Sequence, residues 1–178
     1  TWGGCTASRG IISFEGALFA CRHAFGLIAA PPEPESLLHS RLIIMWGLNP
    51  SESIFGTNNN YYLALAKERG ARFIFVDPRF TDSAAALADQ WIPIIPGADT
   101  AMLIAMAAVM IQEGLYDEGF LSKYTCGFEK FRDYCLGVTD GVPKTPFWAE
   151  AFCGVKAEVI ARLAREYAAS KPANLMGG

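Results

Sequence analysis

Three short polar stretches each follow an apolar run, and their side chains suit the binding of a nucleotide. They are GLNPSES after Trp46, DPRFTDS after Val76 and PGADT after Ile95. If the apolar runs are parallel strands, a ligand binds beyond their carboxyl ends, so the three turns are expected to line one crevice. Their shared position is the main reason to treat them as one site.

The residue types in these turns match the groups of a nucleotide. Asp77 follows the second apolar run, where a carboxylate can accept hydrogen bonds from two neighbouring ribose hydroxyls. Asp99 can accept from the ring N–H and the exocyclic amine of guanine, a pair of donors that adenine lacks. Gly47 lets backbone approach a ligand closely, and Asn49 offers both a donor and an acceptor. No G-x-G-x-x-G follows the first run, which argues against an ordinary NAD or FAD pocket. Because Asp99 suits the paired donors of guanine, guanine is the predicted base.

Each turn also has a simpler structural explanation. Gly-x-Asn-Pro is a common turn composition, and Asp77 with Arg79 can form an ordinary aspartate turn. Asp99 can cap the helix that follows it. Only the joint placement of the three turns favours a ligand site.

Apolar runs alternate with helical patterns along the middle of the chain. Residues 42–46 and 72–76 are typical of buried strands, and residues 61–69 have helical spacing closed by Gly70. A short helix over 83–89, a strand over 91–95 and a helix from Asp99 or Thr100 to about Gln112 follow. This alternation predicts an α/β fold: a doubly wound, mainly parallel sheet with helices on both faces, forming a Rossmann-like dinucleotide-binding domain.

The two ends of the chain have different patterns. Beyond Tyr116 helices predominate, one beginning at the Thr145–Pro146 cap and an amphipathic one over 155–170, before a last strand near 173–176. Prolines at 31, 32 and 34 predict an extended connection. We therefore expect an N-terminal arm and helix over residues 1–35, belonging with a neighbouring domain, and the dinucleotide-binding domain over residues 36–178.

The composition suits a compact α/β domain and argues against nucleic acid as a partner. The chain has 178 residues, 52% of them hydrophobic, and a net charge of -3. The most apolar helix candidate has about a dozen residues, short of the roughly 20 needed to cross a bilayer, so no direct membrane span is expected. The five cysteines show no metal-ligand spacing and are expected to be buried apolar side chains.

Four motifs, WGLNPSES, FIFVDPRFTDSA, WIPIIPGADTAML and KTPFWAEAFCGV, resemble in order and spacing the catalytic (A) subunits of the dimethyl sulfoxide reductase family of molybdopterin oxidoreductases. The resemblance covers nearly the whole chain from Gly10 onward. It implies an internal fragment of a larger enzyme, holding one half of a molybdenum bis(molybdopterin guanine dinucleotide) cofactor. Carried over residue by residue, it predicts nine cofactor-binding residues: Trp46, Gly47, Asn49, Pro50, Glu52, Asp77, Arg79, Gly97 and Asp99.

The resemblance also points to a metal ligand in the N-terminal arm. Gly10 and Ser13 match the glycine and serine of a family G-D-Y-S stretch whose serine ligates molybdenum, so Ser13 is the predicted catalytic and metal-binding residue. Ile11 and Ile12 replace the Asp-Tyr pair of that stretch. Ser13 can instead cap the helix that follows. Cys5 is a weaker rival, since thiolates hold the metal in other branches of the family.

The complete enzyme that the resemblance implies reduces a small oxide, such as dimethyl sulfoxide or a sulfur oxyanion, by oxygen-atom or two-electron transfer in anaerobic respiration. It implies a 4Fe-4S cluster whose ligands are not in this chain, an iron–sulfur electron-transfer subunit and a membrane anchor subunit. The expected location is the periplasm, or a membrane association facing the periplasm, and the fragment alone is expected to be inactive.

Two alternatives remain open. One is a metal-free structural homologue such as the large iron–sulfur subunit of NADH dehydrogenase, and the other is the middle domain of a thiamine diphosphate enzyme. Intact Asn49, Asp77 and Asp99 argue against the first, because a chain that no longer meets a nucleotide has no physical need for this set. The VDPR and PGAD pair argues against the second.

Overall fold

The computed structural model describes residues 15–27, 33–53 and 58–177. They fall into two compact units, Thr1–Glu33 and Pro34–Gly178. The first unit contributes helix α1 (Glu15–Phe25), whose Phe19 side chain is exposed. Ser13 lies outside the described residues, as do Gly10 and Cys5, so the metal ligand stays a prediction.

A four-stranded parallel sheet forms the centre of the second unit. Its spatial order is β3-β2-β1-β4, so the chain steps outward twice and then returns to the other side of β1. Ile44 of β1 is paired in register with Ile74 of β2 and Leu175 of β4. The strands are β1 (Leu42–Trp46), β2 (Arg72–Val76), β3 (Gln90–Ile92) and β4 (Ala173–Gly177).

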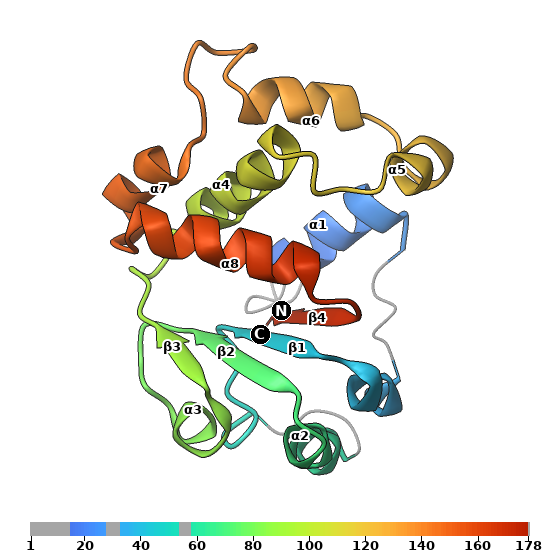
Figure 1. Cartoon of the computed structure of the whole chain (residues 1–178), viewed down its shortest axis with the longest axis vertical. Coiled ribbons are helices and arrows are strands. Elements are labelled where there is room, and N and C mark those ends of the chain that lie inside the picture. Colours follow the sequence, from blue (N-terminus) through green and yellow to red (C-terminus); the bar gives the residue numbers. More distant parts are fainter. Residues whose placement is uncertain (1–14, 28–32, 54–57, 178) are drawn as a thin grey trace, which may run out of the picture. The chain divides into compact units, whose positions relative to one another are not determined.

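Helices cover both faces of this sheet, which confirms the predicted doubly wound α/β fold (Figure 1). The connections between β1, β2 and β3 place α2 (Asn59–Glu68) and α3 (Asp82–Leu87) on one face. The long connection from β3 to β4 contains five helices: α4 (Asp99–Gln112), α5 (Glu118–Tyr124), α6 (Phe128–Cys135), α7 (Pro146–Cys153) and α8 (Ala157–Ala169). Of these, α4, α7 and α8 cover the opposite face. No helix in the described part of the chain is long and apolar enough to cross a membrane.

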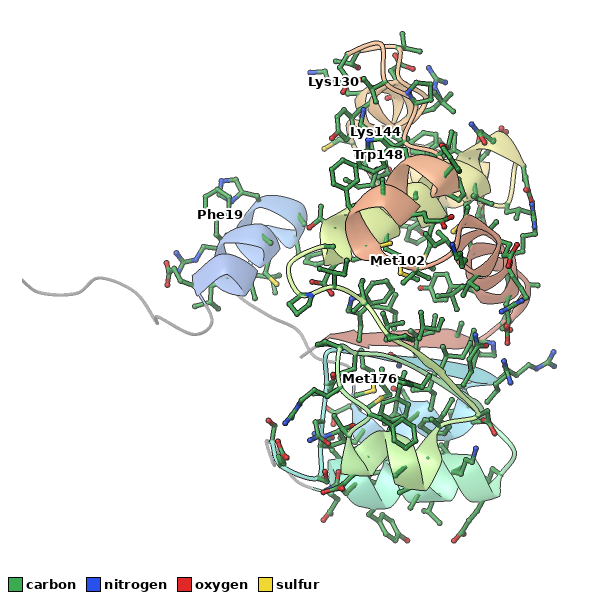
Figure 2. The ribbon with its side chains drawn as sticks, turned by 90° about the vertical axis from the view of Figure 1, so that its left-hand side faces the viewer. Phe19, Met102, Lys130, Lys144, Trp148 and Met176 are labelled. Atoms are coloured by element: carbon green, nitrogen blue, oxygen red, sulfur yellow. The ribbon has the colours of Figure 1, made fainter. Side chains whose placement is uncertain are left out.

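The residues of β1 alternate between two hydrophobic cores. Ile44 and Trp46 belong to the core under α4, α7 and α8, whereas Met45 belongs to the core with α2 and α3. Successive side chains of a strand point to opposite faces, so a sheet covered on both faces requires uniformly apolar strands. Figure 2 shows the two cores on opposite sides of the sheet, with Met102 of α4 in one and Met176 of β4 against the other.

The predicted start of α7 and the last strand are both confirmed. Thr145 caps α7, because its hydroxyl accepts the backbone N–H of Trp148 at 3.1 Å, and Pro146 occupies the first turn. The predicted strand near 173–176 is β4, which pairs with β1 along its whole length.

Two other predictions were wrong. The proline-rich connection is not extended throughout, because residues Pro34–His39 form a 3-10 helix, η1. The fixed φ of Pro34 fits a first helical turn, and Leu37 is buried in the core with α2 and α3. The segment therefore gains apolar burial by forming the 3-10 helix. The cysteines are not uniformly buried: Cys135 is buried, whereas Cys126 is exposed.

A buried lysine holds the segment before α7. Lys144 is 3% exposed, and its ammonium donates to Asp140 Oδ2 at 2.6 Å and lies 4.4 Å from the ring centroid of Tyr134. An unpaired buried ammonium is strongly destabilising, so this pair fixes the loop between α6 and α7. Helix α7 in turn supports the turn after β3, because the carbonyl of Cys153 accepts the N–H of Ile95 at 3.0 Å.

The Asp140–Lys144 pair predicts a stability that depends on pH. The hydrogen bond from the Lys144 ammonium lowers the pKa of Asp140 below its ordinary value of 3.8. A group whose pKa is lower in the folded state adds stability above its unfolded pKa and loses it as pH falls through the folded pKa. We expect the melting temperature to fall on acidification below about pH 4, and this fall to be smaller in Asp140→Asn. Identical acid-induced decreases in the two proteins, followed by circular dichroism, would contradict the assignment.

Candidate functional site

The carboxyl ends of the parallel strands lie at one edge of the sheet, and this edge includes a topological switch point, where successive strands are added on opposite sides of β1. Strands β2 and β3 lie to one side of β1 and β4 lies to the other, so the switch point falls between β1 and β4. Trp46, the last residue of β1, is in register with Val76 of β2 and Gly177 of β4. Open parallel sheets bind ligands in the crevice beside such a switch point. The polar turns that follow β1 and β2 begin at this edge.

Trp46 and Asp99 join the first turn to the third. Trp46 is 6% exposed, and its indole N–H donates to Asp99 Oδ1 at 2.8 Å across 53 positions of sequence. Asp99 is the first residue of α4, the N-cap position is Ala98, and this helix has no side-chain cap hydrogen bond. The simpler explanation, in which Asp99 caps its own helix, is therefore wrong. Its carboxylate binds the end of β1 instead.

Asn49 is buried in a network with two serines. Its Oδ1 accepts from the hydroxyls of Ser51 and Ser83, both at 2.7 Å, and the Ser83 hydroxyl accepts the backbone N–H of Ser51 at 3.0 Å. The Nδ2 group of Asn49 is buried and has no hydrogen-bond partner among the residues that the structure describes. A buried polar group without a partner costs about 1–3 kcal/mol. The turn therefore holds a donor that a ligand oxygen would satisfy.

The second turn brings an aspartate and an arginine to the same edge. Asp77 is 7% exposed, and its Oδ1 accepts the backbone N–H of Arg79 at 2.8 Å, which is the ordinary aspartate turn. The Arg79 side chain is 69% exposed and lies 3.3 Å from Glu52 Oε2 of the first turn. Exposed ion pairs contribute less than about 1 kcal/mol, so the guanidinium can exchange Glu52 for a ligand phosphate at little cost. The ribose-binding role of Asp77 stays a prediction.

Two glycines and a proline shape the turns. Gly47 and Gly97 have φ values of 61° and 82°, in the left-handed region that favours glycine. Apart from the glycine itself and its two chain neighbours, no atom of the described residues lies within 4 Å of the position that a Cβ would take at either glycine, so a ligand can approach closely. The N–H of Gly47 donates to the carbonyl of Val76 at 2.9 Å, and the carbonyl of Pro50 accepts from Asn60 Nδ2 at 3.0 Å. These bonds tie the first turn to β2 and α2.

Two residues of the network, Ser51 and Ser83, were not predicted. Both belong to turns that the sequence analysis selected. Serine and threonine are common near the start of a helix, however, so their presence there does not indicate a hydrogen-bond partner elsewhere in the chain. Thr81, two positions before Ser83, caps α3 by accepting the N–H of Ala84 at 3.2 Å. The sequence alone does not distinguish the capping hydroxyl from the one that binds Asn49. Only the burial of Ser83 beside Asn49 does so.

Taken together, these groups suit an anionic nucleotide. The unpaired Asn49 Nδ2 and the Arg79 guanidinium are donors, the Asp77 and Asp99 carboxylates are acceptors, and Gly47 leaves room for close approach. Phosphate, ribose and base each find a matching group in this set. No cluster of three or more potential metal-ligating side chains occurs within residues 15–27, 33–53 and 58–177.

The serine network predicts a measurable loss of stability in Ser83→Ala. The change removes a hydroxyl that donates to Asn49 and leaves the N–H of Ser51 without its acceptor, so the free energy of unfolding should fall by about 1–2 kcal/mol in urea denaturation. The matched control is Ser122→Ala, which removes an exposed hydroxyl bonded to the carbonyl of Gly119 and should change it by less than about 0.5 kcal/mol. Equal effects in the two variants would argue against a structural network at Asn49.

Comparisons with known proteins match most of the chain to one enzyme family. Residues 16–177 match the family described as Molybdopterin oxidoreductase. The chain is 39% identical over 171 residues to dimethyl sulfoxide reductase DmsA of Escherichia coli (strain K12), covering 88% of this chain and 21% of that protein. It is 35% identical over 186 residues to trimethylamine-N-oxide reductase of Haemophilus influenzae, covering 99% of this chain and 22% of that protein.

A solved structure shares the fold. Acetylene hydratase from Pelobacter acetylenicus superimposes with a TM-score of 0.63 at 28% identity, covering 76% of this chain and 18% of that one. The chain thus spans about a fifth of the length of the two curated relatives. Because the family match extends over residues 16–177, with the predicted turns inside it, the chain belongs to the molybdopterin oxidoreductase family.

Proposed function

We propose that this chain binds one guanine dinucleotide half of a molybdopterin cofactor and forms part of an enzyme that reduces a small oxide. The observation that carries the proposal is the buried, unpaired Nδ2 group of Asn49 at the switch point of a parallel sheet. Family membership implies a molybdenum–pterin cofactor. A dinucleotide form of that cofactor would supply the phosphate and ribose oxygens that such a donor needs.

The residues around the crevice bind and orient the cofactor by ordinary hydrogen bonding. The Arg79 guanidinium suits the pyrophosphate, and the Asp77 carboxylate suits two neighbouring ribose hydroxyls. The Asp99 carboxylate suits the ring N–H and exocyclic amine of guanine. Gly47 and Gly97 keep the backbone open beside these groups. When bound, the cofactor supplies the two-electron and oxygen-atom chemistry, which no side chain can provide.

An oxide of sulfur or nitrogen is the proposed substrate of the whole enzyme. Two relatives are named as reductases of dimethyl sulfoxide and of trimethylamine N-oxide, which supports this class. Ser13 remains the proposed protein ligand of the metal. The metal-free alternative is not favoured, because these relatives are reductases and Asn49, Asp77 and Asp99 are all present. The thiamine diphosphate alternative is not favoured either, since the family match is to molybdopterin oxidoreductases.

The proposal predicts that this chain prefers GDP to ADP. In calorimetric titration, the wild type should bind GDP at least about tenfold more tightly than ADP, because only guanine offers two adjacent donors to Asp99. Asp99→Ala should abolish most of this preference. Arg79→Ala should weaken both nucleotides by a similar factor, since a phosphate contact does not depend on the base.

The matched control is Asp117→Ala, which removes an aspartate that caps α5 by accepting the N–H of Phe120 at 2.8 Å. This variant should keep the GDP preference. Equal affinity for GDP and ADP in the wild type would overturn the guanine assignment. Absence of binding by either nucleotide, with the chain folded by circular dichroism, would overturn the crevice as a nucleotide site.

A further inference from the structure

We infer that Trp46 is a positioning residue that sets the base preference of the site through Asp99, without contacting the base. The inference rests on the proposed function, in which Asp99 recognises guanine. Its structural basis is the 2.8 Å hydrogen bond from Trp46 Nε1 to Asp99 Oδ1. Sequence reasoning placed Trp46 among the cofactor contacts, and the geometry assigns it this indirect role instead.

Packing holds the Trp46 ring in place. The residue ends β1, is 6% exposed, and belongs to the same buried core as Met102 of α4 and Ile160 of α8. A buried indole N–H needs an acceptor, and Asp99 provides it. Because the sheet and the helical layer confine the ring, the N–H points in one direction. Trp46 is therefore a fixed donor rather than a mobile one.

A fixed donor restricts the orientation of the Asp99 carboxylate. The terminal torsion of an aspartate is broad, so a carboxylate without a partner samples many orientations. The α4 start offers Asp99 no side-chain cap bond that would hold it otherwise. A carboxylate has about four acceptor sites on its two oxygens, and Trp46 uses one of them. The remaining sites then face a ligand in a set direction.

Orientation matters because the two purines differ at the edge that meets the carboxylate. Guanine presents two adjacent donors, whereas adenine presents a ring nitrogen lone pair beside one amine. A carboxylate held in place repels that lone pair, but a free one can turn away and accept from water. Removing the Trp46 N–H should therefore weaken GDP binding more than ADP binding. Base preference, rather than overall affinity, is the property that Trp46 controls.

The test is Trp46→Phe, which keeps an aromatic ring in the core and removes only the N–H and part of the ring volume. In calorimetric titrations, the dissociation constant for GDP should rise about five- to tenfold, while that for ADP changes less than about twofold. In an Asp99→Ala background the same substitution should leave the GDP-to-ADP ratio unchanged, because the two residues act as one unit.

Trp148→Phe is the matched control. Trp148 packs against the same core and lies 5.0 Å, between ring centroids, from Phe152 on α7. The substitution removes the same group from the same layer without touching Asp99. It should preserve the GDP-to-ADP ratio even where it lowers stability, which separates positioning from a general loss of packing.

A second measurement needs no ligand. In NMR spectra of the isotope-labelled wild type, the indole Hε1 signal of Trp46, assigned by its NOEs to neighbouring core residues, should shift in Asp99→Asn, where the acceptor loses its charge, while the Trp148 signal stays in place. An unchanged Trp46 signal in Asp99→Asn would overturn the inference even where Trp46→Phe does not fold. A wild type that prefers GDP together with an unaltered ratio in Trp46→Phe would overturn the inference and leave the proposed function intact. Absence of GDP preference in the wild type would overturn both.

Discussion

Strand β1 is buried on both faces and lies between β2 and β4, and this constraint places the first polar side chains of the proposed site beyond its end. All five of its residues are buried, and every one is apolar. A polar side chain inside the strand would have no water and few partners. The first polar side chain is therefore Asn49, in the turn where the strand leaves the sheet. The burial of this one strand therefore determines where the polar side chains of the proposed site can begin.

The alternation of β1 also decides which helix its last residue meets. Leu42, Ile44 and Trp46 face the layer that contains α4, whereas Ile43 and Met45 face α2 and α3. A shift of one residue in register would turn Trp46 toward the other layer and separate its N–H from Asp99. The pairing of Trp46 with Asp99 therefore depends on the whole strand, and through it on the apolar pattern of the sheet.

Sequence patterns predicted the fold because they report on burial along single elements. Uniform apolar runs identified β1 and β2, and the Thr145–Pro146 cap identified the start of α7. The same patterns are silent on contacts between distant segments. Ser83 binds Asn49 across 34 positions and Asp99 binds Trp46 across 53, and nothing in the local composition distinguishes these partners from ordinary capping residues. The 3-10 helix that begins at Pro34 was not predicted for a related reason, since Leu37 gains its burial only from the assembled core.

The proposed site combines an exposed group, which would add affinity for any nucleotide, with buried groups, which would determine the preference for one base. The pair between Arg79 and Glu52 is exposed and weak, so in the proposed site Arg79 would be free to bind a phosphate, an attraction that any nucleotide would share. Trp46 is buried, and the cost of leaving its N–H unpaired would hold Asp99, the proposed base-recognising group, in one orientation. Discrimination between bases requires groups that do not adapt to the wrong ligand. In this fold such groups occur at the end of β1, where the core meets the carboxyl edge of the sheet.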